Sequence, residues 1–143
     1  MTIRLFRENG SGVHQEWYLK AASETFTFND AVGINTSGYV TKFVAGSAFP
    51  ILGLIQETVA ATDSDYASNT KVPVLVAGVE AEYLFDVDTG TAAQTDVGEY
   101  IDLVDHNGVN VGASSNNDVH VTQFVSAALV VGKFVNKVGD IQE

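Results

Sequence analysis

Carboxylates are the first side chains in this sequence to examine for chemistry, because Asp86, Asp88 and Gly90 follow an Asp-x-Asp-x-Gly order. The same order opens an EF-hand calcium loop. That loop also needs a glutamate at its twelfth position and a helix on each side, but the twelfth position here is Val97 and the residues before Gly90 alternate as in a strand. We therefore interpret Asp86 and Asp88 as part of a solvated strand face, not as an ion site.

The remaining candidate groups are also incomplete. Asp63 and Asp65 could offer oxygens to a hard cation, but two carboxylates without a third anchor fit a turn better. His14, His106 and His120 show neither the i,i+4 pairing nor the short spacing to a carboxylate that zinc enzymes display. We expect structural roles for all three histidines.

Nucleophilic and phosphate-binding motifs are missing from the sequence. The chain has no cysteine, no Gly-x-Ser-x-Gly elbow, and no glycine spacing of the dinucleotide-binding or Walker type. The enzyme alternative is a carboxylate-based hydrolase, which would need a deep pocket around Glu80, Glu82 and Asp102. The prediction is a protein that is not an enzyme and that uses no metal or cofactor.

The charge is strongly acidic and unevenly spread. The formal net charge is −11, and residues 43–132 hold twelve acids against one base, Lys71. Such a body repels a phosphate backbone, because affinity for nucleic acid comes mainly from Lys and Arg. No run approaches the roughly 18 apolar residues of a membrane span. We expect a soluble protein with neither nucleic acid nor membrane as its partner.

The side-chain pattern predicts strands. Val and Ile together number 27 against 9 for Leu and Met, which favours a pleated, half-buried surface. The clearest alternation places Val79, Ala81, Tyr83, Phe85 and Val87 inward and the acids between them outward. About eight to ten short strands with regular turn signals indicate an all-β fold, either a small β-barrel or a β-tulip or sandwich.

Several local features follow from turn chemistry. Residues 35–38 predict a tight turn, residues 51–57 a buried strand, and residues 59–70 a long loop. Asn107 and Gly108 predict a hairpin turn with positive φ angles. Pro73 lacks an amide hydrogen and is expected at a strand start or a sheet edge. One short helix is expected within 59–69 or 89–97.

Residues 1–24 lack strict periodicity and are expected to form an N-terminal arm, followed by a β-barrel domain over 25–138 and a short tail over 139–143. The arm holds residue types that are enriched at binding hot spots, so partner binding is assigned to it. An alternative is that Trp17 and Tyr18 cap the barrel core. The candidate binding residues are Arg4, Phe6, Arg7, Trp17 and Tyr18.

Four segments carry a resemblance to a known family: "FNDAVGINTSGYVTKF", "ILGLIQETVAATDSDYASNTKVPVLV", "DVGEYIDLV" and "VGKFV". In this order they resemble the small capsid decoration, or cement, proteins of tailed bacteriophages. The resemblance covers about residues 25–135 and concerns the layout of strands and loops. The acidic body and residues 1–24 depart from the common pattern.

The resemblance implies a structural virion protein that binds the outer surface of an icosahedral phage head and stabilises contacts between major capsid proteins. It further implies contacts with neighbouring copies in a homotrimer, and a location on the capsid surface after synthesis in the host cytoplasm. The alternative is a carbohydrate-binding module of a tail or baseplate adhesin.

Overall fold

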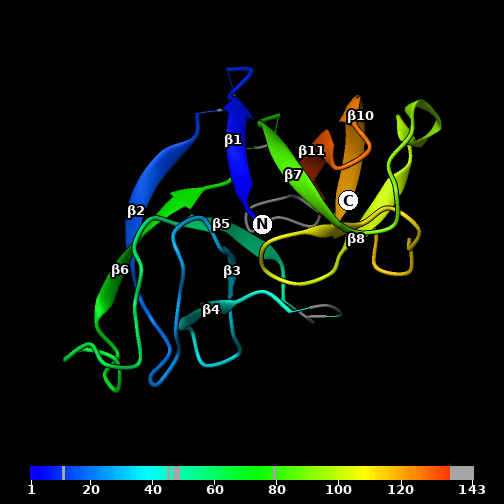
Figure 1. Cartoon of the computed structure of the whole chain (residues 1–143). Helices are drawn as coiled ribbons and strands as arrows, with labels where there is room; N and C mark the ends of the chain where they lie inside the picture. The colour runs from blue at the N-terminus through cyan, green and yellow to red at the C-terminus, as the bar shows by residue number, and fades with distance from the viewer. Residues whose placement is uncertain (11, 45, 47–48, 79, 136–143) are drawn as a thin grey trace.

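The computed structural model describes residues 1–10, 12–44, 46, 49–78 and 80–135, and within them it is an all-β protein, as predicted (Figure 1). A short 3₁₀ helix, η1 (Gln94–Asp96), falls within one of the two segments expected to hold a helix. The strands are β1 (Ile3–Arg7), β2 (His14–Leu19), β3 (Ala31–Ile34), β4 (Val40–Lys42), β5 (Ile51–Ile55), β6 (Lys71–Val76), β7 (Glu82–Thr89), β8 (Tyr100–Leu103), β9 (Val109–Asn110), β10 (Val119–Ser126) and β11 (Leu129–Phe134).

Five strands form a closed barrel in the order β7-β11-β10-β8-β9, and β9 closes the ring by pairing in parallel with β7. β1 is an additional strand on the same sheet. One edge of β7 is therefore shared between two partners. Its first half, residues 82–85, pairs with β1, and its last residues, Val87 and Thr89, pair with β9.

The other strands form a second sheet in the order β2-β6-β5-β3-β4. This sheet curls, because Lys20, next to the end of β2, makes an isolated parallel bridge with Val40 of β4. The amide of Ala21 donates to the carbonyl of Val40 at 2.8 Å. Figure 1 shows the barrel strands β7, β8, β10 and β11 on one side and the second sheet, with β2, β4 and β6, on the other.

Strand β5 joins the two halves because both of its faces are buried. Leu54 packs in the barrel core with Tyr83 and Phe85, whereas Leu52 and Ile55 pack in a second core inside the curled sheet. This explains why residues 51–55 are all buried and show no alternation. At Gly53 an added Cβ would lie 2.0 Å from the carbonyl oxygen of Leu75, so the close approach of β6 requires glycine.

The N-terminal segment is not a separate arm, which corrects the prediction for residues 1–24. β1 pairs with β7 of the barrel, and β2 pairs with β6 of the second sheet over six residues. The segment lacks a single periodicity because its two halves belong to different sheets. The expected domain boundary at residue 24 therefore falls inside the fold, while residues 136–143, with the predicted tail, lie outside the described residues.

The hairpin of β8 and β9 is confirmed, but its predicted turn geometry is wrong. Neither Asn107 nor Gly108 has a positive φ, and residues 104–108 connect the strands instead of a two-residue turn. The glycine is needed for another reason. A Cβ on Gly108 would lie 2.6 Å from Sδ of Met1 and 3.0 Å from Cβ of Asp88.

Pro73 lies inside the five-stranded sheet, not at its edge or at a strand start as predicted. Its carbonyl accepts a hydrogen bond from the amide of Gln56, just after β5 ends. The N and O atoms of one strand residue point to the same side. The amide hydrogen that Pro73 lacks would therefore point toward Gln56, one residue past the end of β5. The proline thus removes only the reciprocal hydrogen bond to Gln56, at the very end of the β5–β6 ladder.

Other local predictions agree with the structure. Asn35 accepts hydrogen bonds at Oδ1 from the amides of Ser37 and Tyr39, which builds the expected turn between β3 and β4. The segment between β5 and β6 is the expected long loop. Val79, predicted to point inward, lies outside the described residues. Within the described part of the chain, no helix has the length and apolar character needed to cross a bilayer.

Candidate functional site

Glu82 of β7 is buried, which corrects the prediction that it belongs to a solvated strand face. Its carboxylate accepts hydrogen bonds from Nε of Arg7 at 2.7 Å, Nδ2 of Asn9 at 2.8 Å and Oγ1 of Thr122 at 2.5 Å. Burial raises the pKa of Glu82, but these three hydrogen bonds and the charge of Arg7 outweigh it and lower the pKa to about 2. Glu82 is therefore a charged anchor for the chain between β1 and β2.

A second acid anchors the start of β1. Asp86 accepts the amide of Thr2 at 2.7 Å, and its Oδ1 lies 3.6 Å from Nη2 of Arg4. Arg4 and Arg7, both predicted to bind a partner, thus have acidic partners within the protein. Their first role is to hold β1 against the barrel.

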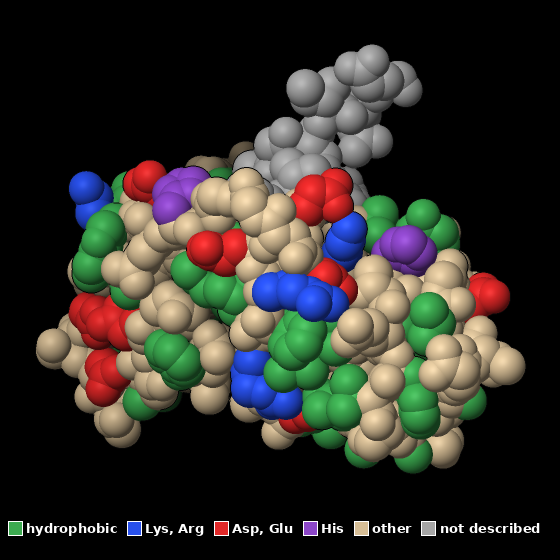
Figure 2. Space-filling model, turned by 90° about the horizontal axis from the view of Figure 1, so that it is seen from above, with side chains coloured by type: hydrophobic (Ala, Val, Ile, Leu, Met, Phe, Trp, Pro, Cys, Tyr) green, Lys and Arg blue, Asp and Glu red, His purple; other side chains and the backbone are tan. Residues whose placement is uncertain are grey.

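Phe6 is the exposed member of this strand, with 44% of its surface accessible. The Arg7 guanidinium carbon lies 4.8 Å from the centroid of its ring, in a cation–π contact. Figure 2 shows basic side chains next to hydrophobic and acidic ones in the middle of the face seen from above. Leu5, the neighbouring residue, packs against the barrel core, so alternation along the strand places Phe6 on the outer face.

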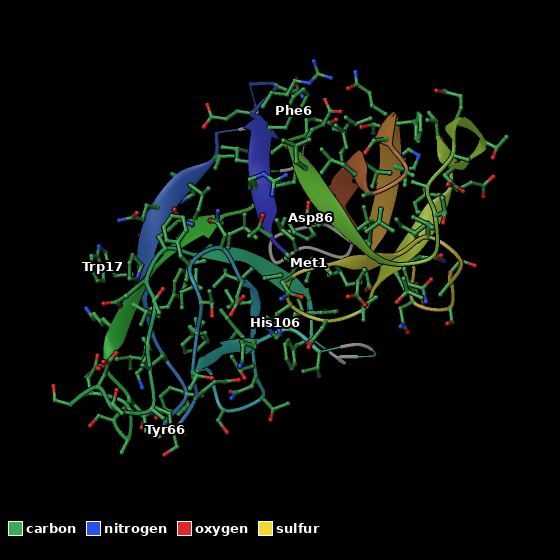
Figure 3. The ribbon with its side chains drawn as sticks, viewed as in Figure 1. Met1, Phe6, Trp17, Tyr66, Asp86 and His106 are labelled. Carbon is green, nitrogen blue, oxygen red and sulfur yellow. The ribbon has the colours of Figure 1, made fainter. Side chains whose placement is uncertain are left out.

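Trp17 and Tyr18 of β2 have different roles. Trp17 is 58% exposed, so it does not cap the barrel core. Leu19, two residues on and therefore on the same face of the strand, is 44% exposed. Tyr18 points to the other face and packs against the second core, and its pKa is raised by burial and by the charge of Glu16. Figure 3 shows Trp17 and Phe6 well apart, on β2 and β1.

The outer edge of β2 is regular. β2 is a terminal strand of its sheet, and its pairing with β6 has no register shift, whereas the pairing of β1 with β7 is interrupted between Leu5 and Arg7. The amide of Lys20 donates toward β6, to the carbonyl of Thr70. By alternation, the backbone groups of Gln15 and Trp17 point outward, away from β6. We define the docking surface as this edge together with the side chains of Trp17 and Leu19.

Asp102 is buried for a structural reason. Its carboxylate accepts hydrogen bonds from the amides of Ser115, Asn116 and Asn117 at 2.8–3.0 Å and from the hydroxyl of Ser115. Nearby Asp118 accepts the amide of Leu103 at 2.9 Å, and burial raises its pKa, with the Asp102 charge adding to the effect. The oxygens of Asp102 thus hold the loop before β10.

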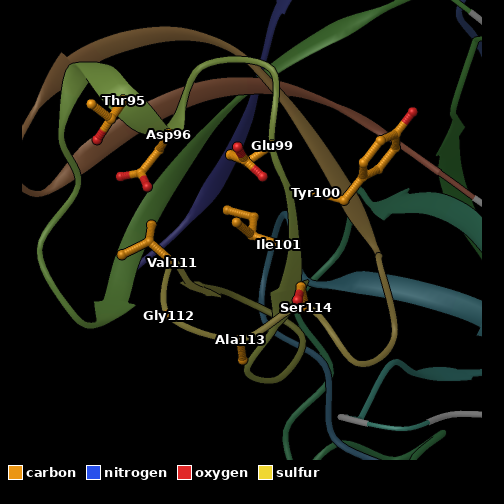
Figure 4. Close-up of a pocket in the computed structure, with 9 residues that line it drawn as sticks. All are labelled: Thr95, Asp96, Glu99, Tyr100, Ile101, Val111, Gly112, Ala113 and Ser114. Atoms are coloured by element: carbon orange, nitrogen blue, oxygen red, sulfur yellow. The ribbon is translucent and has the colours of Figure 1, made fainter.

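The alternative function, a carboxylate-based hydrolase, would require a deep pocket around Glu80, Glu82 and Asp102. One hollow of about 270 Å³ lies beside β8 and η1 (Figure 4), and none of those three acids lines it. Among the residues that the structure describes, no group of three or more His, Asp or Glu side chains is placed to hold a metal ion. The residues that line the hollow are Thr95, Asp96, Glu99, Tyr100, Ile101, Val111, Gly112, Ala113 and Ser114.

The three histidines lie in separate places. Nε2 of His14 is 3.4 Å from Glu16, on the same strand. His106, in the β8–β9 loop, lies with Nε2 3.8 Å from Asp30, and its carbonyl accepts the amide of Ala31. His120 stacks on Tyr100 with ring centroids 4.7 Å apart.

Asp63, predicted as a turn residue, accepts the amide of Ala60 at 2.8 Å, which closes such a turn. Asp65 accepts the hydroxyl of Thr70 at 3.3 Å. Both carboxylates therefore act within their own loop.

Comparison with protein-family models gives no match for this chain, and a search of curated proteins gives none either. Support for the docking surface as a binding site therefore comes from its geometry alone. Sequence reasoning named Trp17 of the docking surface as a candidate but not Leu19, which the i,i+2 spacing from Trp17 could have indicated once β2 was recognised as a strand.

Proposed function

We propose that this chain is a structural virion protein that binds the outside of an icosahedral phage head and stabilises contacts between major capsid proteins. The observation that carries the proposal is the docking surface on β2, where a regular terminal strand exposes Trp17 and Leu19. Natural proteins usually protect such edges with charges, bulges or a covering segment. Among the described residues the strand β2 pairs only with β6, and the one further bridge, from Lys20 to Val40, lies just past its end. A terminal strand with a large exposed aromatic side chain fits a binding strand.

The chemistry of the docking surface specifies the kind of contact. Trp17 and Leu19 supply apolar area, and the outward backbone groups of Gln15 and Trp17 can pair with an extended segment of the capsid protein. The protein carries a formal net charge of −11, so a basic segment on the shell would be attracted to it. Arg4 and Arg7 contribute indirectly, by holding β1 and presenting Phe6.

The scaffold suits this function. The two cores, joined through β5, make one packed body. A cement protein stabilises a shell only if it binds the assembled shell more tightly than the separate capsid proteins. Many copies on one shell then act together by multivalency. In this proposal neighbouring copies associate as homotrimers on the capsid surface.

The test uses phage heads that lack the protein. Purified wild-type protein is expected to bind such heads and to raise the temperature at which they release DNA. The double variant Trp17→Ser, Leu19→Ser should lose at least tenfold in affinity, whereas Phe28→Ser, at a residue that is 50% exposed outside β2, should bind normally. Equal binding by the double variant and the wild type would disprove the role of β2, and heads that gain no stability would disprove the function.

A carbohydrate-binding adhesin is the second candidate, and Tyr100 is the observation that favours it. Tyr100 is 47% exposed beside the hollow, and sugars commonly pack on exposed aromatic rings. A glycan array probed with and without calcium tests this function. Binding that Tyr100→Ala abolishes would support the adhesin, and an array without signal would reject it.

A further inference from the structure

Lys20, the residue after β2, is completely buried. Placing an ammonium group away from water costs several kcal/mol unless other groups replace its hydration. Within the described part of the chain, no carboxylate lies within ion-pair distance of Lys20. The compensation for this charge must therefore come from neutral groups.

Backbone carbonyls provide that compensation. The Lys20 ammonium donates to the carbonyl of Ser68 at 2.7 Å and to that of Tyr66 at 2.9 Å. A third carbonyl, that of Ala21, lies 3.5 Å away. An ammonium group has three donors, so the three oxygens match its hydrogen-bonding capacity.

The main chain of Lys20 is tied to the same loop. Its amide donates to the carbonyl of Thr70 at 2.9 Å, and its carbonyl accepts Nδ2 of Asn69 at 2.9 Å. On its other side Lys20 makes the isolated bridge with Val40 that joins β2 to β4. One residue thus connects the end of β2, the loop over residues 66–70 and the start of β4. Tyr66, at the start of this loop, is labelled in Figure 3.

We propose that the carbonyls of Ala21, Tyr66 and Ser68 form a binding site for a primary ammonium group, which the protein fills with its own Lys20 side chain. This internal cation fixes the loop over residues 66–70 and completes the closure of the second sheet. The inference does not depend on the proposed function.

The competing explanation is that the aliphatic stem of Lys20 only fills space. In that case methionine, which is unbranched and similar in length, would replace it without loss. If the ammonium is required, methionine removes one donor from the carbonyl oxygen of Ser68 and one from that of Tyr66, which keeps the amide of Ser23. The loop should then open more often. The two explanations therefore predict opposite results for the same substitution.

The first experiment compares Lys20→Met with Lys71→Met. Lys71 is exposed and lies directly opposite Leu19 on β6, which makes it a matched control on the same sheet. Chymotrypsin cleavage after Tyr66, followed by mass spectrometry, should be at least tenfold faster in Lys20→Met than in the wild type and unchanged in Lys71→Met. Equal cleavage of both variants at the wild-type rate would overturn the proposal. If Lys20→Met does not fold while Lys71→Met does, the requirement for the ammonium is supported.

The second experiment tests the site by chemical rescue. Lys20→Ala removes three carbons and the ammonium group, which propylammonium can replace. Propylammonium should restore resistance to cleavage after Tyr66 in Lys20→Ala and should leave the wild type unaffected. Tetramethylammonium, which carries the same charge but no N–H donor, should have no effect. Equal rescue by both ions, or rescue by neither, would exclude a specific ammonium site.

Discussion

The barrel and the second sheet close in different ways. The barrel closes through backbone ladders, since β9 pairs with both β7 and β8. The second sheet closes through the single bridge of Lys20 and Val40, supported by a buried ammonium group. A ladder depends little on any one side chain, whereas the role proposed for Lys20 makes the second closure depend on one residue. The comparison predicts that substitution of Lys20 disturbs the closure of the second sheet more than any single side-chain substitution on β9 disturbs the closure of the barrel.

A similar contrast separates the two N-terminal strands. β1 is held to the barrel by a ladder with β7 that contains a register shift, and by acids on β7. β2 is held by a regular ladder and leaves a regular edge exposed. On β1 the charged side chains attach the strand to the barrel. On β2 the exposed apolar side chains are available for binding a partner.

The largest expected effect tests whether the two halves unfold as one unit. Phe85 is fully buried between Tyr83 and Phe134, so Phe85→Ala should lower the free energy of unfolding by about 3–5 kcal/mol. Because β5 packs in both cores, the second sheet should unfold together with the barrel. Urea unfolding followed by far-UV circular dichroism and by Trp17 fluorescence should give coincident curves. Two separate transitions would mean that the cores are independent.

The next effect tests the attachment of β1. Glu82→Gln should lower the free energy of unfolding at pH 7 by about 2–3 kcal/mol, because Arg7 and Asn9 lose a charged acceptor. The matched variant Glu80→Gln removes an acid that is 59% exposed in its ion pair with Lys133, and it should cost less than about 1 kcal/mol. Comparable losses from the two variants would contradict an anchoring role for Glu82.

The pH dependence has a definite sign. The pKa of Glu82 falls from 4.5 to about 2 on folding, so its carboxylate stabilises the folded state above pH 4.5. That contribution is lost as the pH falls from about 5 toward 2. Wild-type protein should therefore lose more stability than Glu82→Gln between pH 5 and pH 2, as measured by urea unfolding at each pH. Parallel losses in both proteins would show that Glu82 does not carry this dependence.

The smallest effect concerns β2. Trp17→Ala should change the free energy of unfolding by less than about 1 kcal/mol, because more than half of the side chain is already in water. Tyr18→Ala, on the buried face of the same strand, should cost more. Thermal unfolding of the two variants measures the difference. A larger loss for Trp17→Ala would place Trp17 in the core and remove the main support for the docking surface.

The sequence by itself determined the all-β class, the turn over residues 35–38, a buried strand predicted over 51–57 and found over 51–55, and the hairpin of β8 and β9. These features depend on neighbouring residues, through a period of two, through a continuous apolar run in the case of β5, and through local turn chemistry. The sequence also named Phe6 and Trp17 among the binding candidates by their residue type, and the structure places both side chains partly in solvent.

Only the tertiary structure decided which acids are buried, where residues 1–24 lie, and that Lys20 has no contact with water. Asn9 is 73 residues from Glu82, and Lys20 is 48 residues from Ser68. Alternation assigns a side chain to one face of a strand, but it does not say which distant segment covers that face. Burial of Glu82 and Lys20 comes from such long-range contacts, so it could be known only once both sheets were in place.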